Sequence, residues 1–90
     1  MKIVRNASAG TLESSDVYVE VSPSDGGATI EVESVVINQF GDKIRSLVDD
    51  IVRENGVSDV TVRLCDKGAL ECVIRARVET ALLRAGEGEQ

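Results

Sequence analysis

The chain contains no histidine and very few aromatic residues, and both shortages limit its chemistry. Histidine is the commonest general base and the commonest metal ligand, so its absence removes the usual side chain for catalysis and for metal binding. Tyr18 and Phe40 are the only aromatic residues, which argues against a surface on which nucleic-acid bases stack. The net charge of −6 argues the same way, because a phosphate backbone repels an acidic protein.

Cysteines and long apolar runs are also scarce. Cys65 and Cys72 are too few to hold a zinc ion and match no redox motif, so we interpret them as reduced thiols of a cytosolic protein. No apolar run approaches the ~20 residues of a membrane span, and residues 1–6 lack the apolar segment of a signal peptide. We therefore expect a cytoplasmic protein that binds neither membranes nor nucleic acids.

Two stretches alternate between apolar and polar residues, as half-buried strands do. They span residues 17–22 and 29–33, and a dense turn signal at residues 23–27 separates them. This pattern predicts an antiparallel hairpin. The side chains expected to face the core are Val17, Val19, Val21, Ile30 and Val32.

A first helix follows, in which apolar residues recur at three- and four-residue steps. Asn55 and Gly56 end it, because glycine tolerates the left-handed backbone on which many helices end. Its start stays open: Ser34 is a suitable cap, whereas the β-branched residues 35–37 favour a longer strand. The stripe consists of Ile37, Phe40, Ile44, Leu47, Val48, Ile51 and Val52.

A third strand over residues 59–65 and a second helix complete the pattern. Asp66 is the expected amino cap of this helix, Arg77 interrupts its apolar face, and Gly86 closes it. Its apolar residues are Leu70, Val73, Ile74, Val78, Ala81, Leu82 and Ala85.

The order β-β-α-β-α predicts an α+β fold. The simplest way to bury every apolar face is a two-layer sandwich, with two helices on one face of a small mixed sheet. We expect a single domain over residues 17–86, a flexible amino-terminal segment over residues 1–16 and a frayed tail over residues 87–90. Residues 6–16 are rich in turn-forming residues and are expected to form an exposed loop outside the core, whereas residues 2–5 leave a short edge strand open.

The charged residues give no sign of a catalytic or metal site. Six carboxylates could form a metal or acid/base cluster, but those in strands and helices fall on polar faces, so we expect a solvated surface. The six are Glu13, Asp16, Glu31, Glu33, Asp49 and Asp50. Gly26-Gly27 is a turn without the lysine of a phosphate loop. Ser14 alone is a poor nucleophile, because a serine hydroxyl needs a base and the chain has no histidine. From the residues alone Ser14 is a loop serine, and any chemistry at its hydroxyl must be performed by another protein.

Three segments closely resemble one family. Residues 10–16 (GTLESSD) are similar to the modification loop of the acyl carrier protein (gamma) subunit of citrate lyase. Residues 39–42 (QFGD) and residues 66–77, which contain DKGALEC and IRAR, match the same family in the same order.

The resemblance implies a covalent prosthetic group, 2'-(5''-phosphoribosyl)-3'-dephospho-CoA, joined by a phosphodiester to Ser14, with the adjacent Ser15 as the alternative site. It further implies that the thiol of this arm carries acetyl and citryl thioesters between the alpha (transferase) and beta (lyase) subunits of citrate lyase, after a prosthetic-group transferase has attached it. Catalysis would belong to those subunits.

Two other functions remain open. One is the carrier subunit of malonate decarboxylase, which resembles this family and uses the same kind of group. The other is a small ligand-binding or regulatory module, since fold alone says little about function.

Overall fold

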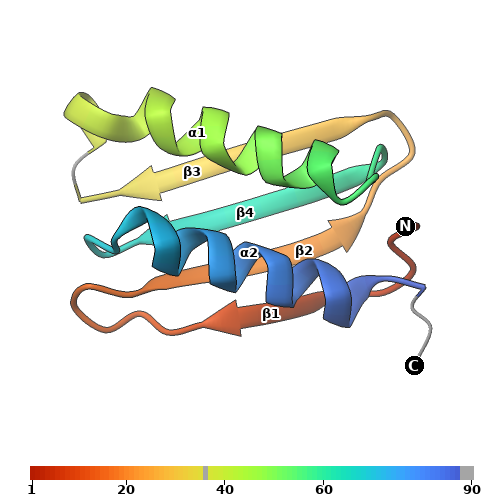
Figure 1. Cartoon of the computed structure of the whole chain (residues 1–90), viewed down its shortest axis with the longest axis horizontal. Coiled ribbons are helices and arrows are strands. Elements are labelled where there is room, and N and C mark those ends of the chain that lie inside the picture. The colour runs from red at the N-terminus through yellow and green to blue at the C-terminus, as the bar shows by residue number, and fades with distance from the viewer. Residues whose placement is uncertain (36, 88–90) are drawn as a thin grey trace.

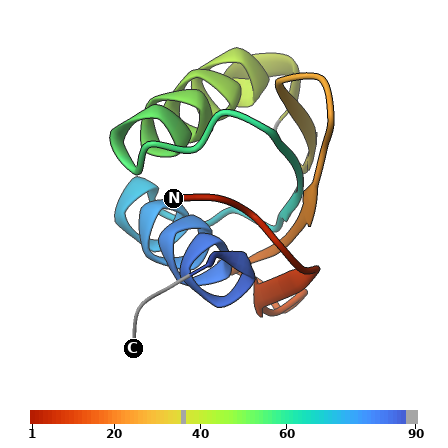
Figure 2. The same cartoon turned by 90° about the vertical axis from the view of Figure 1, so that its right-hand side faces the viewer.

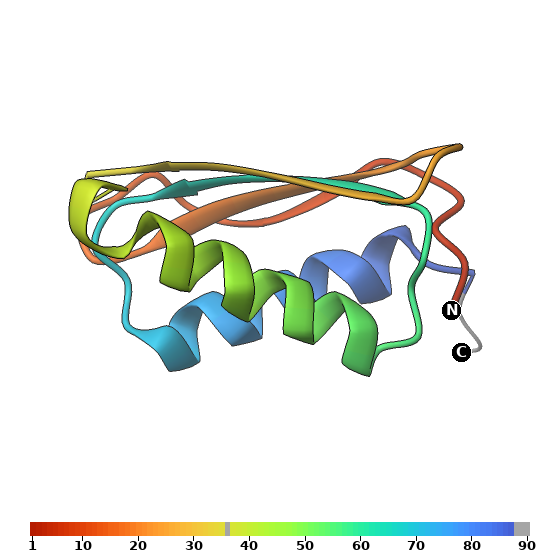
Figure 3. The same ribbon diagram turned by 90° about the horizontal axis from the view of Figure 1, so that it is seen from above.

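The computed structural model describes residues 1–35 and 37–87, and it shows one four-stranded sheet with two helices on the same face (Figures 1, 2 and 3). The elements in chain order are β1 Ala7–Gly10, β2 Val17–Pro23, β3 Ala28–Ser34, α1 Ile37–Glu54, β4 Val60–Asp66 and α2 Glu71–Ala85. The predicted α+β two-layer sandwich is therefore confirmed. Within the described residues no helix is long and apolar enough to cross a membrane.

The sheet is mixed, with the strand order β1-β2-β4-β3. β2 pairs antiparallel with both β1 and β4, whereas β3 pairs parallel with β4. A parallel pair needs a crossover connection, and α1 supplies it on the helical face of the sheet. α1 therefore connects two parallel strands that are neighbours in the sheet.

The predicted hairpin between residues 17–22 and 29–33 was wrong. β4 lies between β2 and β3, so these two strands are not neighbours. Val60 at the start of β4 is opposite Pro23 of β2 on one side and Ala28 of β3 on the other. The physical reason is that the inward residues of β2 and of β4 are buried and both strands lie inside the sheet, whereas Ile30 and Val32 of β3 are only partly buried and β3 takes the edge.

The predicted loop over residues 6–16 was also wrong in part, because Ala7–Gly10 form β1 at the edge of the sheet. Ala9 faces the core and is buried. Four small residues have a low intrinsic preference for strands, so the sequence contained little indication of β1. The strand is stabilised by its pairing with β2. Further upstream, Ile3 is buried and forms an isolated bridge with Gly86.

The core lies between the sheet and the helices, as the alternation and the helical stripes predict. Ile30 and Val32 are only partly buried, because β3 is an edge strand. Leu70 precedes α2 and is exposed, contrary to the predicted stripe. Side chains of residues 36–41, which include Ile37 and Phe40, and the tail beyond residue 87 fall outside the described part of the chain. The predicted core residues that are buried are Val17, Val19, Val21, Ile44, Val48, Ile51, Val52, Val60, Val62, Leu64, Ile74, Val78, Ala81, Leu82 and Ala85.

Candidate functional site

Ser14 lies in the loop between β1 and β2, at one end of the sheet (Figure 1). We call residues 11–16 the serine loop. Leu12, Glu13, Ser14 and Ser15 are all exposed, so the predicted exposure of the Ser14 side chain is confirmed. The loop is nevertheless ordered by hydrogen bonds, which the turn-forming composition alone did not predict.

Asp16 is the centre of these hydrogen bonds. Its Oδ2 accepts a hydrogen bond from Thr11 Oγ1 at 2.6 Å, and its Oδ1 accepts one from the Val17 amide at 2.7 Å. Arg77 of α2 donates to both carboxylate oxygens, from Nε to Oδ1 at 3.1 Å and from Nη2 to Oδ2 at 2.9 Å. The Asp16 side chain is only 15% exposed. Asp16 therefore joins the two ends of the serine loop to each other and to a helix.

These bonds also set the charge of Asp16. The hydrogen bond from Thr11 lowers the pKa of the carboxyl most, and the bonds from Arg77 and the Val17 amide act in the same direction. Together they lower the pKa of Asp16 to about 2. The carboxyl is thus ionised at neutral pH and paired with a guanidinium, so the expectation that Asp16 belongs to a solvated acidic surface was wrong.

The two adjacent serines differ in backbone geometry. Ser15 has a φ of 66°, in the left-handed region that non-glycine residues seldom adopt, and its amide donates to the Lys67 carbonyl at 2.8 Å. Ser14, in the same turn, does not have a positive φ. Lys67 in turn donates its amide to the Asp16 carbonyl at 2.9 Å. The backbone of Ser15 therefore helps to hold the turn in which Ser14 is exposed.

The serine loop is hydrogen-bonded to Lys67, in the connection between β4 and α2. Asp66, at the end of β4, is 2% exposed; its Oδ1 accepts a hydrogen bond from the Ala69 amide at 2.9 Å, and its Oδ2 accepts one from Ser34 Oγ at 2.8 Å. The predicted role of Asp66 as the amino cap of the second helix was wrong, since Leu70 occupies that position without a side-chain hydrogen bond. Asp66 instead fixes the turn that carries Lys67.

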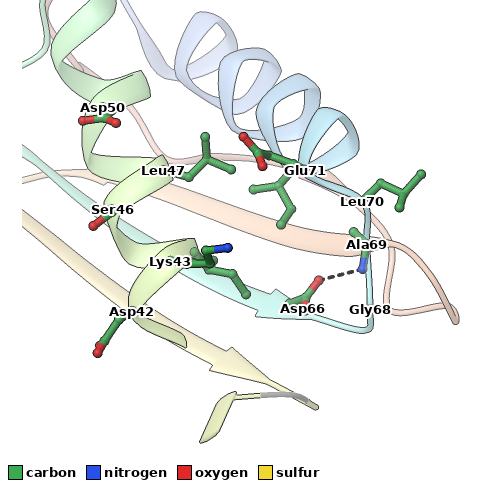
Figure 4. Close-up of a pocket in the computed structure, with 12 residues that line it drawn as sticks. Asp42, Lys43, Ser46, Leu47, Asp50, Asp66, Gly68, Ala69, Leu70 and Glu71 are labelled. Atoms are coloured by element: carbon green, nitrogen blue, oxygen red, sulfur yellow. Dashed lines mark hydrogen bonds between the residues drawn. The ribbon is translucent and has the colours of Figure 1, made fainter. Parts of the chain in front are cut away.

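A groove of about 780 Å³ lies beside this turn, between α1 and the start of α2 (Figure 4). Leu47 and Glu71 face one another across it, and Gly68 and Ala69 form the end nearest the turn. The sequence did not predict it, because a space between two helices depends on how they pack.

The cysteines and the other carboxylates form no second candidate site among the described residues. Cys65 is partly buried and Cys72 is exposed, and both are free thiols. Among the described residues no group of three or more histidine, cysteine or carboxylate side chains is arranged to hold a metal ion. The features that sequence reasoning missed are the roles of Asp16 and Arg77, whose positions are 61 residues apart and carried no common pattern.

Fold and site together define a class: a small two-layer domain that holds out a serine hydroxyl at one end. The family model described as "Malonate decarboxylase delta subunit (MdcD)" matches residues 4–85. The citrate lyase acyl carrier protein of Pectobacterium atrosepticum is 53% identical over 90 residues, which cover 100% of this chain and 94% of that protein. The citrate lyase acyl carrier protein of Rhodopseudomonas palustris is 49% identical over 85 residues, which cover 94% of this chain and 88% of that protein.

The chain therefore belongs to the citrate lyase acyl carrier protein family. It is an acyl carrier protein and not itself a catalyst, as the sequence resemblance implied. Membership also implies a covalently bound prosthetic group. A chain in the crystal structure of a Pseudomonas malonate decarboxylase hetero-tetramer in complex with malonate has the same fold, with a TM-score of 0.79 and 22% identity over 96% of this chain and 93% of that one.

Proposed function

We propose that this protein is the acyl carrier subunit of citrate lyase, and that Ser14 carries its prosthetic group. The group is 2'-(5''-phosphoribosyl)-3'-dephospho-CoA, whose terminal thiol holds acetyl and citryl thioesters. The observation that carries the proposal is the exposed Ser14 hydroxyl on an ordered loop, in a chain about half identical to proteins named citrate lyase acyl carrier protein. Ser15 is the less suitable site, because its backbone is held in a left-handed turn.

Attachment is a phosphoryl-type transfer performed by a separate prosthetic-group transferase. Ser14 Oγ forms a bond to phosphorus of an activated polyphosphate ester of the group, the bond from that phosphorus to the leaving phosphate or pyrophosphate breaks, and the transferase accepts the hydroxyl proton. Nothing is oxidised or reduced. The chain needs only to present the hydroxyl, since a serine without an adjacent base does not activate itself.

The arm then serves two partner active sites. The alpha (transferase) subunit would exchange acetyl for citryl on the thiol, and the beta (lyase) subunit would cleave the citryl thioester to oxaloacetate and leave acetyl on the arm. A tether at an exposed loop keeps each intermediate at high local concentration near both sites. The prosthetic group supplies the thioester chemistry, whereas this chain's residues hold the attachment point at one end of a rigid domain.

The malonate decarboxylase carrier is the second candidate function, because the matching family model and the similar solved structure both carry that name. Reconstitution separates the two. Arm-loaded, acetylated carrier is mixed with the alpha and beta subunits of citrate lyase and citrate, and in parallel with the remaining subunits of malonate decarboxylase and malonate. We expect oxaloacetate release in the first mixture and no decarboxylation in the second. Turnover in the second mixture alone would overturn the citrate lyase assignment, and turnover in neither would favour an unrelated binding module.

A further inference from the structure

Arg77 ties the serine loop to the body of the domain. It lies on α2, and its guanidinium meets the Asp16 carboxylate side-on, through Nε at 3.1 Å and Nη2 at 2.9 Å. Two parallel charge-assisted hydrogen bonds of this kind fix orientation as well as distance. The Asp16 carboxylate therefore cannot rotate freely, and the Thr11 hydroxyl and the Val17 amide that donate to it are fixed as well.

Those contacts reach across the serine loop. Asp16 is the last residue of the loop, and the hydroxyl that donates to its Oδ2 belongs to Thr11, the first residue of the loop. Thr11 Oγ1 then accepts a hydrogen bond from the Glu13 amide at 3.2 Å, and the Asp16 amide donates to the Glu13 carbonyl at 3.1 Å. The chain from Arg77 through Asp16 and Thr11 thus closes the loop around the residues that flank Ser14.

We propose that Arg77 is a positioning residue for the attachment of the prosthetic group: through Asp16 it holds the serine loop in the conformation in which the transferase can reach Ser14 Oγ. This inference rests on the carrier function proposed above. Arg77 touches neither the hydroxyl nor the incoming phosphorus, so it acts on attachment through the loop and not on the bond-making step.

A loosened loop has a specific kinetic consequence. When only a fraction of the molecules is competent to bind, the apparent affinity falls by that fraction, whereas the chemistry of the bound complex is unchanged. Loss of the guanidinium should therefore raise the KM of the transferase for the carrier and leave kcat near its wild-type value. A rise of about tenfold is expected if about one molecule in ten of the variant holds the competent loop conformation.

The chain offers a matched control on the same helix. Arg75 is 40% exposed, as Arg77 is, and donates from Nη1 to Glu54 Oε1 at 2.8 Å, but this ion pair joins α2 to α1. Arg77→Gln and Arg75→Gln each remove one guanidinium of equal exposure from α2. Arg77→Lys keeps the charge and loses the fork, and Asp16→Asn keeps the shape of the acceptor and loses its charge.

The experiment measures initial rates of mass gain by the intact carrier, with purified transferase and activated donor, over a range of carrier concentrations. We expect KM to rise about tenfold in Arg77→Gln and Asp16→Asn, less in Arg77→Lys, and not at all in Arg75→Gln. Amide hydrogen exchange on the same unloaded proteins should show faster exchange at Ser15 and Asp16 in Arg77→Gln, with the amides of β4 unchanged. That pattern separates a loosened loop from general loss of stability.

Each other outcome counts against a particular claim. Equal KM in Arg77→Gln and wild type, an equal rise in Arg75→Gln, or a lowered kcat at unchanged KM would overturn the positioning role while leaving the carrier function intact. If Arg77→Gln does not fold, Arg77→Lys and Asp16→Asn decide the question by the same criteria. A wild-type protein that gains no mass at all would overturn the proposed function itself, and the positioning role with it.

Discussion

Arg77 and Asp16 form a two-pronged ion pair between α2 and the loop that presents Ser14, with donor–acceptor distances of 3.1 and 2.9 Å. The pair is 61 residues apart in sequence and joins α2 to the loop between β1 and β2. It makes the conformation of a surface loop depend on the packing of a helix.

Acid should weaken the native state through Asp16. Its pKa is about 2 in the folded protein and 3.8 in the reference state, so the unfolded chain binds the proton more readily. The resulting stability is present above pH 3.8 and is lost as the pH falls toward 2. Urea unfolding at several pH values should show a steeper decline over this window for the wild type than for Asp16→Asn. Parallel curves for the two proteins would contradict the structural role of this carboxylate.

Gly10→Ala should destabilise the fold more than an ordinary glycine replacement. Gly10 ends β1 with a φ of +95°, and a Cβ at this position would overlap the carbonyl oxygen of Val17 on the neighbouring strand. Gly27 is the matched control, because it has the same φ of +95° and open space around it. Gly27→Ala should cost about 1–2 kcal/mol from the left-handed backbone alone. Gly10→Ala should cost clearly more in the free energy of unfolding, and equal losses would show that the close approach of the strands is unimportant.

Asp66→Ala should remove a buried acceptor from the turn below the serine loop. Asp66 is 2% exposed and accepts hydrogen bonds from the Ala69 amide and the Ser34 hydroxyl, and alanine would remove both of these bonds. We expect a loss of about 2–3 kcal/mol in the free energy of unfolding. Asp59→Ala is the control: Asp59 also accepts from a backbone amide, that of Gly27 at 3.0 Å, but at an exposed site, and should cost less than about 1 kcal/mol. A larger effect at Asp59 would contradict this view of the turn.

Ser15→Gly should be tolerated and should slightly stabilise the protein, because glycine adopts a φ of 66° without a steric penalty. Ser15→Val should lower the free energy of unfolding by about 1–2 kcal/mol, since a β-branched side chain is strongly disfavoured there. Thermal unfolding measures both changes. A stabilised valine variant would mean that the left-handed turn at Ser15 is absent in solution.

Periodicity predicted most of the scaffold, because each long element carries its own pattern. The stripe from Ile44 to Val52 and the alternation from Val60 to Leu64 both reflect burial on one face. Their residues are buried as predicted, except that Leu47 is only partly buried. Strand order was not predictable in this way. Whether residues 17–22 pair with 29–33 or with β4 depends on competition among strands that share the same local pattern.

The site shows the same division. The exposure of Ser14 followed from the polar, turn-forming residues around it, and the family resemblance singled it out as the attachment point. The Arg77–Asp16 pair could not be predicted, because an arginine on an apolar helix face and an aspartate in a loop have many possible partners until the fold brings two of them together. Long-range polar contacts of this kind are properties of the packed molecule.

The most direct test of the account is the mass of the intact chain after co-production with its prosthetic-group transferase and donor-forming enzyme, followed by peptide mapping. The account predicts one added phosphoribosyl-dephospho-CoA group on the peptide that contains residues 10–16, lost in Ser14→Ala and retained in Ser15→Ala, with both variants folded. A wild-type mass equal to that of the bare chain, or a group that remains in Ser14→Ala, would contradict it.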